Sequence, residues 1–352
     1  MPFPPFSCTF SPNIPELLSD LNCSLVVSTY QAGKVITLSP NREKDSLTQL
    51  ARTFDTPMGM ALQGDRLALA SKTEVTVFAN DIRLSGRYPQ KPNTYDAMLV
   101  PRAKYYTGQV AMHDMAWCDD GLVGVNTAFS CLCKMSQDYS FEPVWVPPYI
   151  SELVAEDRCH LNGMAVRAGK PKYVSMFSAT DTQRGWDKTK SESGQVLDVT
   201  NNEKVIGGLF MPHSPRIFND KLYLLLSGTG EVVQVDTGKG TYDVIQRLPG
   251  FVRGLDCYGD YLFVGLSRVR KNHTFSDLPI AKKELICGIA VIHLPSGSVV
   301  GQIQYQSSCE ELYDVLILPG YQRPNILNTK DKTHLLSLSL PQSSFWATIP
   351  EN

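Results

Sequence analysis

Three of the six histidines in this 352-residue chain occupy matching places in a repeated sequence pattern. His113 lies in MHDMAW, His160 in CHLNGM and His213 in PHSPRI. Later copies of the pattern carry Arg253 in VRGLDC and Glu311 in ELYDVL. If folding brings these five side chains together, imidazole nitrogens and a carboxylate become available for metal binding or for proton transfer.

Two chemistries fit these residue types. His113, His160 and His213 would bind a divalent metal ion such as zinc, iron or copper, with an open position for water or substrate. Without a metal, His113 or His160 would act as a general base, and Arg253 would hold a carboxylate or an oxyanion. Either chemistry predicts an enzyme, either a hydrolase or lyase or a metal-dependent oxidase, for a small or peptidic anionic substrate. The alternative is structural, with the histidines bonded to backbone groups of a wet channel.

The elements that must position these residues are β-strands. Apolar strand openings recur at intervals of 40 to 60 residues, at 57–62, 112–117, 161–166, 212–217, 252–257 and 312–317. Each opening except the last is followed by a second β-forming run. The turns are rich in Gly, Asp and Asn, and no long helical period occurs in the sequence. Repeats of this length with about four strands each are typical of a β-propeller.

We therefore predict an all-β fold, a six-bladed β-propeller that forms a single domain over residues 1–352. The last opening lacks a second and a third strand of its own, and residues 24–40 supply strands of the same rhythm. Segments 24–40 and 310–318 would together complete one blade, which closes the ring and removes its open edges. Seven blades are the alternative, if 85–110 contains a degenerate blade.

The first strand of each propeller blade lines the central channel, so alternating side chains should face it. The second position of each opening holds Met58, His113, Asn162, His213, Arg253 and Tyr313. Two residues earlier lie Thr56, Ala111, His160, Met211, Phe251 and Glu311. Asn162 and Tyr313 would complete a polar wall that binds substrate. Asp114 and Asp314 follow the second position and should bond to backbone amides of the neighbouring blade, and Arg216 should be a surface or inter-blade partner.

Four long segments, 85–110, 141–159, 178–193 and 268–286, should emerge on the face where the first strands begin, and loops on a rigid scaffold usually carry binding functions. Tyr30 is expected at the mouth of the channel, and Trp145 and Trp186 are expected to line the pocket there. Arg158 would either reach the mouth or form an exposed salt bridge. Two other functions remain open. One is a non-catalytic propeller that binds a protein or peptide on this looped face, and the other is a protein that binds a small metabolite.

Composition excludes several classes of protein. With 33 basic and 35 acidic side chains, the formal charge of −2 predicts no nucleic-acid partner and no membrane partner. No apolar run is long enough for a membrane helix, and MPFPPFSCTF does not resemble a secretory signal. The nine cysteines include no CxxC pair, so we expect reduced thiols in a cytoplasmic protein.

The stretches STYQAGKV, KPNTYDA, YYTGQVAMHDMAW, EDRCHLNGMA, MPHSPR, LPGFVRGLDCYGDYLFVGLS and ELYDVLILPG resemble a bacterial, largely cyanobacterial family of conserved hypothetical proteins. Some members are fused to tetratricopeptide repeats. The resemblance covers nearly the whole chain and implies a propeller-like protein. It assigns no activity to any residue of this chain. More distantly, the architecture is similar to the six-bladed superfamily of gluconolactonases, strictosidine synthase-like proteins and NHL proteins. Gluconolactonases use mainly Glu, Asn and Asp at the axis, whereas histidines dominate here. Carotenoid-cleaving oxygenases also have a histidine-rich axis, but with seven blades and four iron-binding histidines.

Overall fold

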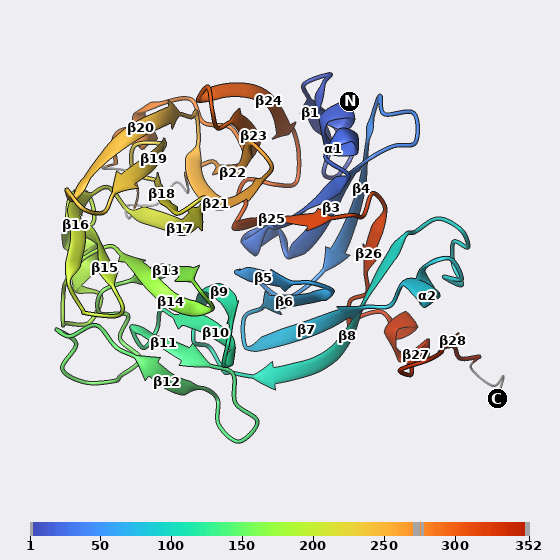
Figure 1. Cartoon of the computed structure of the whole chain (residues 1–352), viewed down its shortest axis with the longest axis horizontal. Helices are drawn as coiled ribbons and strands as arrows, with labels where there is room; N and C mark the ends of the chain where they lie inside the picture. Colours follow the sequence, from blue (N-terminus) through green and yellow to red (C-terminus); the bar gives the residue numbers. More distant parts are fainter. Residues whose placement is uncertain (1–2, 270–274, 276–277, 349–352) are drawn as a thin grey trace.

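Six small sheets form a ring around a central axis (Figure 1). The structure is a computed structural model that describes residues 3–269, 275 and 278–348. Helix contributes little: α1 (Ile14–Asp20) and α2 (Ile82–Ser85) are short. The all-β, six-bladed prediction is confirmed. The seven-blade alternative is wrong, because segment 85–110 contains β8 (Ala97–Tyr106), the fourth strand of the first blade.

Five blades contain four strands each that follow one another in the chain, and neighbouring strands pair antiparallel. Innermost strand first, they are β5 (Met60–Gln63), β6 (Arg66–Ala70), β7 (Glu74–Asn80) and β8; β9 (Met112–Cys118), β10 (Gly121–Asn126), β11 (Cys131–Lys134) and β12 (Glu142–Trp145); β13 (Leu161–Arg167), β14 (Lys170–Met176), β15 (Gly194–Asp198) and β16 (Lys204–Leu209); β17 (Pro212–Phe218), β18 (Lys221–Leu226), β19 (Glu231–Asp236) and β20 (Thr241–Arg247); and β21 (Phe251–Tyr258), β22 (Tyr261–Ser267), β23 (Gly288–His293) and β24 (Ser298–Tyr305).

The sixth blade combines strands from distant parts of the sequence, as predicted. Its order is β25 (Asp314–Pro319), β2 (Cys23–Ser28), β3 (Lys34–Pro40) and β4 (Leu47–Thr53). Leu25 pairs with Ile317 and Val27 with Val315, and all four side chains are buried. These apolar residues pack against strands of the fifth blade in one core cluster. The hydrophobic pattern of β2 therefore fixes both its register and its place in the ring.

Short segments extend this ring at its outer edge. Strand β1 (Cys8–Phe10) joins β24, and β26 (Pro324–Ile326) pairs parallel to β8. Strands β27 (Ser337–Ser339) and β28 (Ser344–Trp346) form a separate hairpin near the C-terminus (Figure 1). All nine cysteines, which lie within the described residues, are free. In that part of the chain, no helix has the length and apolar character that crossing a membrane requires.

The innermost strands are held together by the residue that follows the second position of each opening. This residue alternates around the ring between glycine and a side chain that accepts hydrogen bonds: Gly59, Asp114, Gly163, Ser214, Gly254 and Asp314. Asp114 accepts from the backbone N–H of Met164 in the next blade at 3.0 Å, and Asp314 accepts from Met60 N–H at 2.9 Å. The predicted inter-blade role of Asp114 and Asp314 is confirmed.

Glycine at the alternate positions permits close approach of adjacent innermost strands. Gly254 has φ +79°, and a Cβ atom there would lie 2.6 Å from the backbone nitrogen of Val315. Arg216 completes the contact between blades, because its guanidinium pairs with both oxygens of Asp114, at 2.7 and 3.0 Å. Arg216 is thus an inter-blade partner, one of the two roles expected from the sequence.

Candidate functional site

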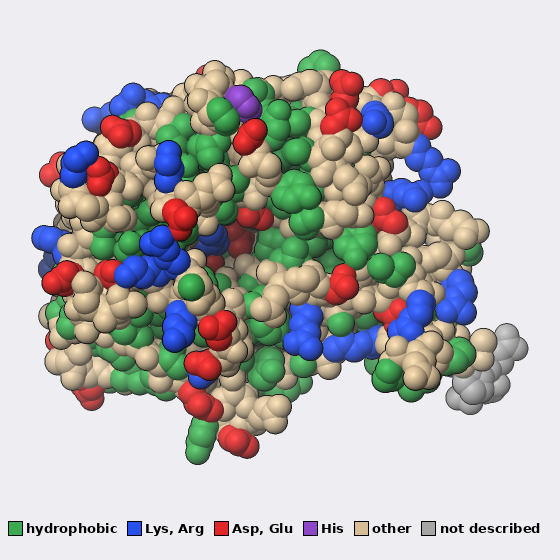
Figure 2. All heavy atoms as spheres, viewed as in Figure 1, with side chains coloured by type: hydrophobic (Ala, Val, Ile, Leu, Met, Phe, Trp, Pro, Cys, Tyr) green, Lys and Arg blue, Asp and Glu red, His purple; other side chains and the backbone are tan. Residues whose placement is uncertain are grey.

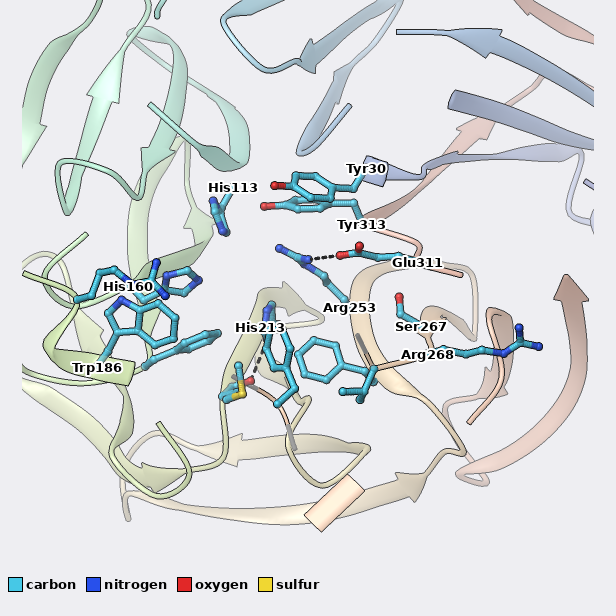
Figure 3. Close-up of a pocket in the computed structure, with 16 residues that line it drawn as sticks. Tyr30, His113, His160, Trp186, His213, Arg253, Ser267, Arg268, Glu311 and Tyr313 are labelled. Atoms are coloured by element: carbon cyan, nitrogen blue, oxygen red, sulfur yellow. Dashed lines mark hydrogen bonds and ion pairs between the residues drawn. The ribbon is translucent and has the colours of Figure 1, made fainter. Parts of the chain in front are cut away.

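A cavity of about 320 Å³ lies on the axis of the ring (Figure 3). Eight of the residues predicted from the sequence line it: Tyr30, His113, His160, Trp186, His213, Arg253, Glu311 and Tyr313. They come from all blades except the first. The structure therefore brings together most of the predicted site, in one cavity large enough for a small molecule.

A repeated backbone conformation places the histidines. The residue two positions before the second position of the opening is left-handed in four blades: Thr56 (φ 49°), Ala111 (φ 50°), His160 (φ 49°) and Met211 (φ 52°). In two blades the carbonyl oxygen of this residue accepts a hydrogen bond from a histidine. His113 Nδ1 lies 2.8 Å from Ala111 O, and His213 Nδ1 lies 2.9 Å from Met211 O. The same local turn thus fixes both rings.

These contacts define the tautomer of His113 and His213. A carbonyl oxygen can only accept, so Nδ1 carries the hydrogen in both rings, and a neutral ring keeps its lone pair on Nε2. Burial lowers the pKa of both imidazoles well below the usual range, and the nearby positive charge of Arg253 lowers it further. Both rings are therefore neutral at pH 7, with Nε2 as a hydrogen-bond acceptor or proton acceptor.

His160 is held differently. Its Nδ1 donates to the carboxylate of Asp157, at 2.9 and 3.1 Å from the two oxygens. The imidazole packs against Phe177 and Trp186, with ring centroids 4.3 and 4.4 Å away, and lies edge-on to His113 at 5.0 Å. A carboxylate that orients an imidazole is a common feature of acid–base sites. Asp157 was not predicted, because it precedes the strand opening and its loop gave no signal.

Arg253 extends into the centre of the cavity (Figure 3). Its Nη1 donates to Glu311 at 3.1 Å, and both side chains are largely buried. The guanidinium also lies over the Tyr313 ring, 3.5 Å from the centroid, and Tyr313 stacks on Tyr30 at 5.4 Å. Burial raises the pKa of Tyr313, so its hydroxyl stays protonated at pH 7. Arg253 is thus positioned to hold an anionic group beside the imidazoles.

Asn162 lies just beyond this cavity, in a narrow constriction of about 10 Å³ that it shares with His113, His213, Arg253 and Tyr313. The Asn162 amide nitrogen and the Tyr313 hydroxyl are buried and have no hydrogen-bond partner among the described residues. The indole nitrogen of Trp186, on the cavity wall, is likewise without one in that part of the chain. Buried donors of this kind usually bind water or a ligand.

Aromatic rings form much of the remaining wall. Phe177 and Phe251 flank His213, with ring centroids at 5.2 and 5.4 Å, and Phe275 lies 5.6 Å from Phe251. Phe251 was mapped to the axis from the sequence, but Phe177 and Phe275 were not singled out. Phe177 directly follows the second strand of the third blade, a place where the equivalent residues of other blades are small and polar.

Two predicted residues do not reach the cavity. Trp145 ends β12, the outermost strand of the second blade, where its indole donates to Asn202 at 2.8 Å. The expectation that 141–159 is wholly a loop over the channel is thus wrong. Arg158 instead pairs with Glu156 and Asp181, at 2.9 and 2.8 Å, and ties its loop together.

Of the four long segments, two line the cavity and two do not. Segment 178–193 contributes Arg184 and Trp186 to the cavity wall, and segment 268–286 contributes Arg268, Val269 and Phe275. Segments 85–110 and 141–159 contribute no side chain to that wall among the described residues, because each contains an outermost strand of its blade. The loops that reach the cavity are those between the second and third strands.

The three histidines share one feature with metal ligands. A histidine that binds a metal usually donates its other N–H to a carbonyl or carboxylate, and all three histidines make such a hydrogen bond. Among the described residues, however, no group of three or more His, Cys, Asp or Glu side chains is arranged to hold a metal ion. A guanidinium also lies in the cavity. Zinc, iron or copper at the axis stays a prediction.

Comparison with known proteins places this geometry in a family. A family model described as "Domain of unknown function (DUF4915)" matches residues 12–327. No curated protein matches the chain. Among solved structures, a protein of unknown function from Bacteroides caccae aligns over 84% of this chain and 98% of its own, with TM-score 0.51 and 10% identity. A chain of a nidogen/laminin complex aligns over 85% of this chain and 99% of its own, with TM-score 0.49 and 11% identity. At such identity, the likeness to the Bacteroides caccae protein concerns the fold alone.

Proposed function

This chain belongs to the DUF4915 family of unknown function, and we propose that its axial cavity is the active site of an enzyme that acts on a small anionic substrate. Arg253 would hold the anionic group, and a neutral imidazole would accept a proton from the bound molecule. One observation carries the proposal. Two imidazoles are fixed by their Nδ1 hydrogen bonds so that Nε2 is the proton acceptor, beside a largely buried guanidinium.

The buried position of these groups favours catalysis. A general base must be unprotonated at the operating pH, and the lowered pKa of His113 and His213 meets this condition. Their basicity is weaker in proportion, because proton transfer is most efficient when the pKa of the base lies near the operating pH. The Arg253 charge would stabilise negative charge that develops on the substrate as the proton leaves. His160, oriented by Asp157, supplies a third imidazole that could return the proton. The reaction class remains a hydrolytic or elimination step, both of which need such proton transfers.

The test separates a catalytic role of Nε2 from a structural role of Nδ1. Asparagine in place of histidine keeps a donor at the position of Nδ1 and deletes Nε2. Wild-type protein, His113→Asn and His213→Asn are each incubated with a deproteinised cell extract, and anionic metabolites are followed by mass spectrometry. We expect the wild type to consume a small acid and both variants to lose at least a hundredfold in rate, as for a removed general base.

His293→Asn is the matched control, because His293 lies on β23 and bonds to Ser296 outside the cavity. It should consume the metabolite at the wild-type rate. If His113→Asn and His213→Asn also did so, the catalytic assignment would be wrong. If the wild type retained a small acid but consumed none, the protein would be a small-metabolite-binding protein instead.

A further inference from the structure

The cavity limits the size of what it can hold. Its volume of about 320 Å³ lies at the low end of the range of about 300–1,000 Å³ that is usual for small-molecule sites. The constriction beneath it, of about 10 Å³, has room for one water molecule at most. The expected ligand is therefore a compact molecule that does not pass through the constriction.

Hydrogen-bond donors gather at the inner end. Besides Arg253, the Asn162 amide and the Tyr313 hydroxyl lie at the constriction, and these two buried donors have no partner within the described residues. Leaving a buried donor unpaired costs about 1–3 kcal/mol. A carboxylate can pair with these donors, because it accepts several hydrogen bonds through its two oxygens. Its geometry also matches the planar guanidinium of an arginine. The inner end of the ligand therefore carries a carboxylate.

The neighbouring imidazoles require a hydrogen-bond donor on the ligand. Nε2 of His113 and of His213 can only accept, so the ligand must donate a hydrogen bond beside its carboxylate. A hydroxyl group and an ammonium group both donate. The ammonium is disfavoured, because the Arg253 charge acts on both imidazoles at this place and would repel a second cation, and the Glu311 carboxylate is already paired with Arg253. The donor is therefore a hydroxyl group.

The outer part of the ligand meets aromatic rings. Trp186, Phe177, Phe251 and Phe275 follow one another around the wall, interleaved with the imidazoles of His160 and His213. An aromatic ring, which prefers offset or edge-on contacts with other rings, fits this wall.

We infer that the axial cavity binds an aryl hydroxy acid, an aromatic ring that carries a hydroxyl group and a carboxylate at one end. The carboxylate lies against Arg253, the hydroxyl donates to a histidine Nε2, and the ring lies between the aromatic side chains. This inference rests on the proposed function, since it names the substrate class of the same cavity.

Isothermal titration of the full chain with 3-phenyllactate tests the inference. Three analogues each lack one feature: lactate has no ring, 3-phenylpropionate has no hydroxyl group, and phenylalanine has an ammonium group in place of the hydroxyl. We expect 3-phenyllactate to bind at least tenfold more tightly than each of the three, since burying a ring or pairing a buried acceptor each changes affinity by about that factor. Arg253→Gln should weaken 3-phenyllactate binding about ten- to a hundredfold.

Arg247→Gln is the matched control, because Arg247 lies on the outermost strand β20 and pairs with Glu231. It should bind within twofold of the wild type. Equal binding of lactate would overturn the aryl group, equal binding of 3-phenylpropionate would overturn the hydroxyl group, and tighter binding of phenylalanine would show that an amine is the donor. Because these comparisons use wild-type protein, they hold even if Arg253→Gln fails to fold.

Failure here is distinguishable from failure of the proposed function. If no aryl acid binds, while the wild type still consumes another small acid that His113→Asn and His213→Asn do not, the substrate class is wrong and the active site stands. If 3-phenyllactate binds and no metabolite is consumed, the ligand class stands and the enzyme proposal fails.

Discussion

At the scale of residues, the axial histidines are two kinds of group in one cavity. His113 and His213 donate Nδ1–H to backbone carbonyls of their own turns, whereas His160 donates to a carboxylate. The backbone contacts fulfil the structural alternative considered from the sequence, but they occupy only one nitrogen of each ring. The other nitrogen of each ring is available to accept a proton or a hydrogen bond, so it can take part in a reaction. A single histidine can therefore serve the fold and the proposed reaction together.

The neutral state of His113 has a direct chemical readout. Diethyl pyrocarbonate acylates neutral imidazole only, so its rate with an unstructured histidine peptide falls as pH decreases through about 6.5. Burial lowers the pKa of His113, and we expect its acylation rate to stay constant between pH 7.5 and 6.0. Mass spectrometry of the modified peptide measures the rate. A rate that follows the unstructured peptide would contradict the assignment.

The same burial should make stability depend on pH. Between the lowered pKa of His213 and about 6.5, the unfolded chain binds a proton that the folded protein does not, so the free energy of unfolding falls as pH decreases. The loss is up to about 1.4 kcal/mol per pH unit for one group. Asp314 acts in the opposite direction, because burial raises its pKa to about 7 and its stabilising contribution is lost as pH rises through that value.

Comparing His213→Asn with the wild type isolates the histidine, since Asp314 is present in both. Urea denaturation at pH 7.5 and 5.5 should show a smaller loss of stability for the variant, while its amide keeps a donor toward Met211 O. An equal loss in both proteins would mean that His213 is protonated in the folded state over this range.

At the scale of elements, the innermost strands are joined by polar contacts as well as by apolar packing. Asp114 accepts from a backbone amide of the next blade and pairs with Arg216. At Gly254, by contrast, adjacent innermost strands approach so closely that no side chain fits. Alternation of these two kinds of residue lets six strands approach one axis without leaving their amides unpaired.

Removing the Asp114 carboxylate should therefore be costly. Asp114→Ala removes the carboxylate that pairs with the partly buried Arg216 guanidinium and leaves the Met164 amide without its acceptor. We expect a loss of about 3–5 kcal/mol in the free energy of unfolding, measured by urea denaturation. Asp138→Ala, at an exposed position, should change it by less than about 0.5 kcal/mol. A similarly small effect of Asp114→Ala would show that the contact between blades does not depend on it.

At the scale of the whole molecule, the ring depends on one blade that is shared between distant segments. Strand β2 pairs with β25 on one side and with β3 on the other, and its six residues are all buried. Glu311 and Tyr313 lie at the start of this blade, and Tyr30 follows β2. The blade that closes the ring therefore also supplies side chains that complete the cavity.

Removing residues 1–28 tests this coupling. The deletion exposes the edges of β25 and β3, and we expect the protein to associate or to lose its cooperative unfolding transition. Size-exclusion chromatography with thermal denaturation measures both. Removing residues 337–352, which contain the β27–β28 hairpin outside the six sheets, should leave a monomeric ring. A monomeric, cooperatively folded protein without residues 1–28 would show that the sixth blade is dispensable.

The sequence by itself determined the blades and the closure of the ring, and it favoured six blades over seven. These depend on the spacing of strand openings and on alternating hydrophobicity along the chain, which are local properties. It also placed His113, His213, Arg253 and Tyr313 at the axis, because one strand position recurs in every blade. Asp114 and Asp314 were assigned to the contacts between blades for the same reason.

Only the tertiary structure decided which side chains share the cavity. The height of a residue along the axis depends on strand tilt and stagger. These are properties of the whole ring and cannot be predicted from any single residue. Phe177, Asp157 and the loop that carries Trp186 meet His160 within the third blade, whereas Trp145 lies at the outer edge of the second blade on β12. His113 meets the same imidazole from the second blade. Repetition along the chain thus predicts the scaffold, and contacts across blades create the site.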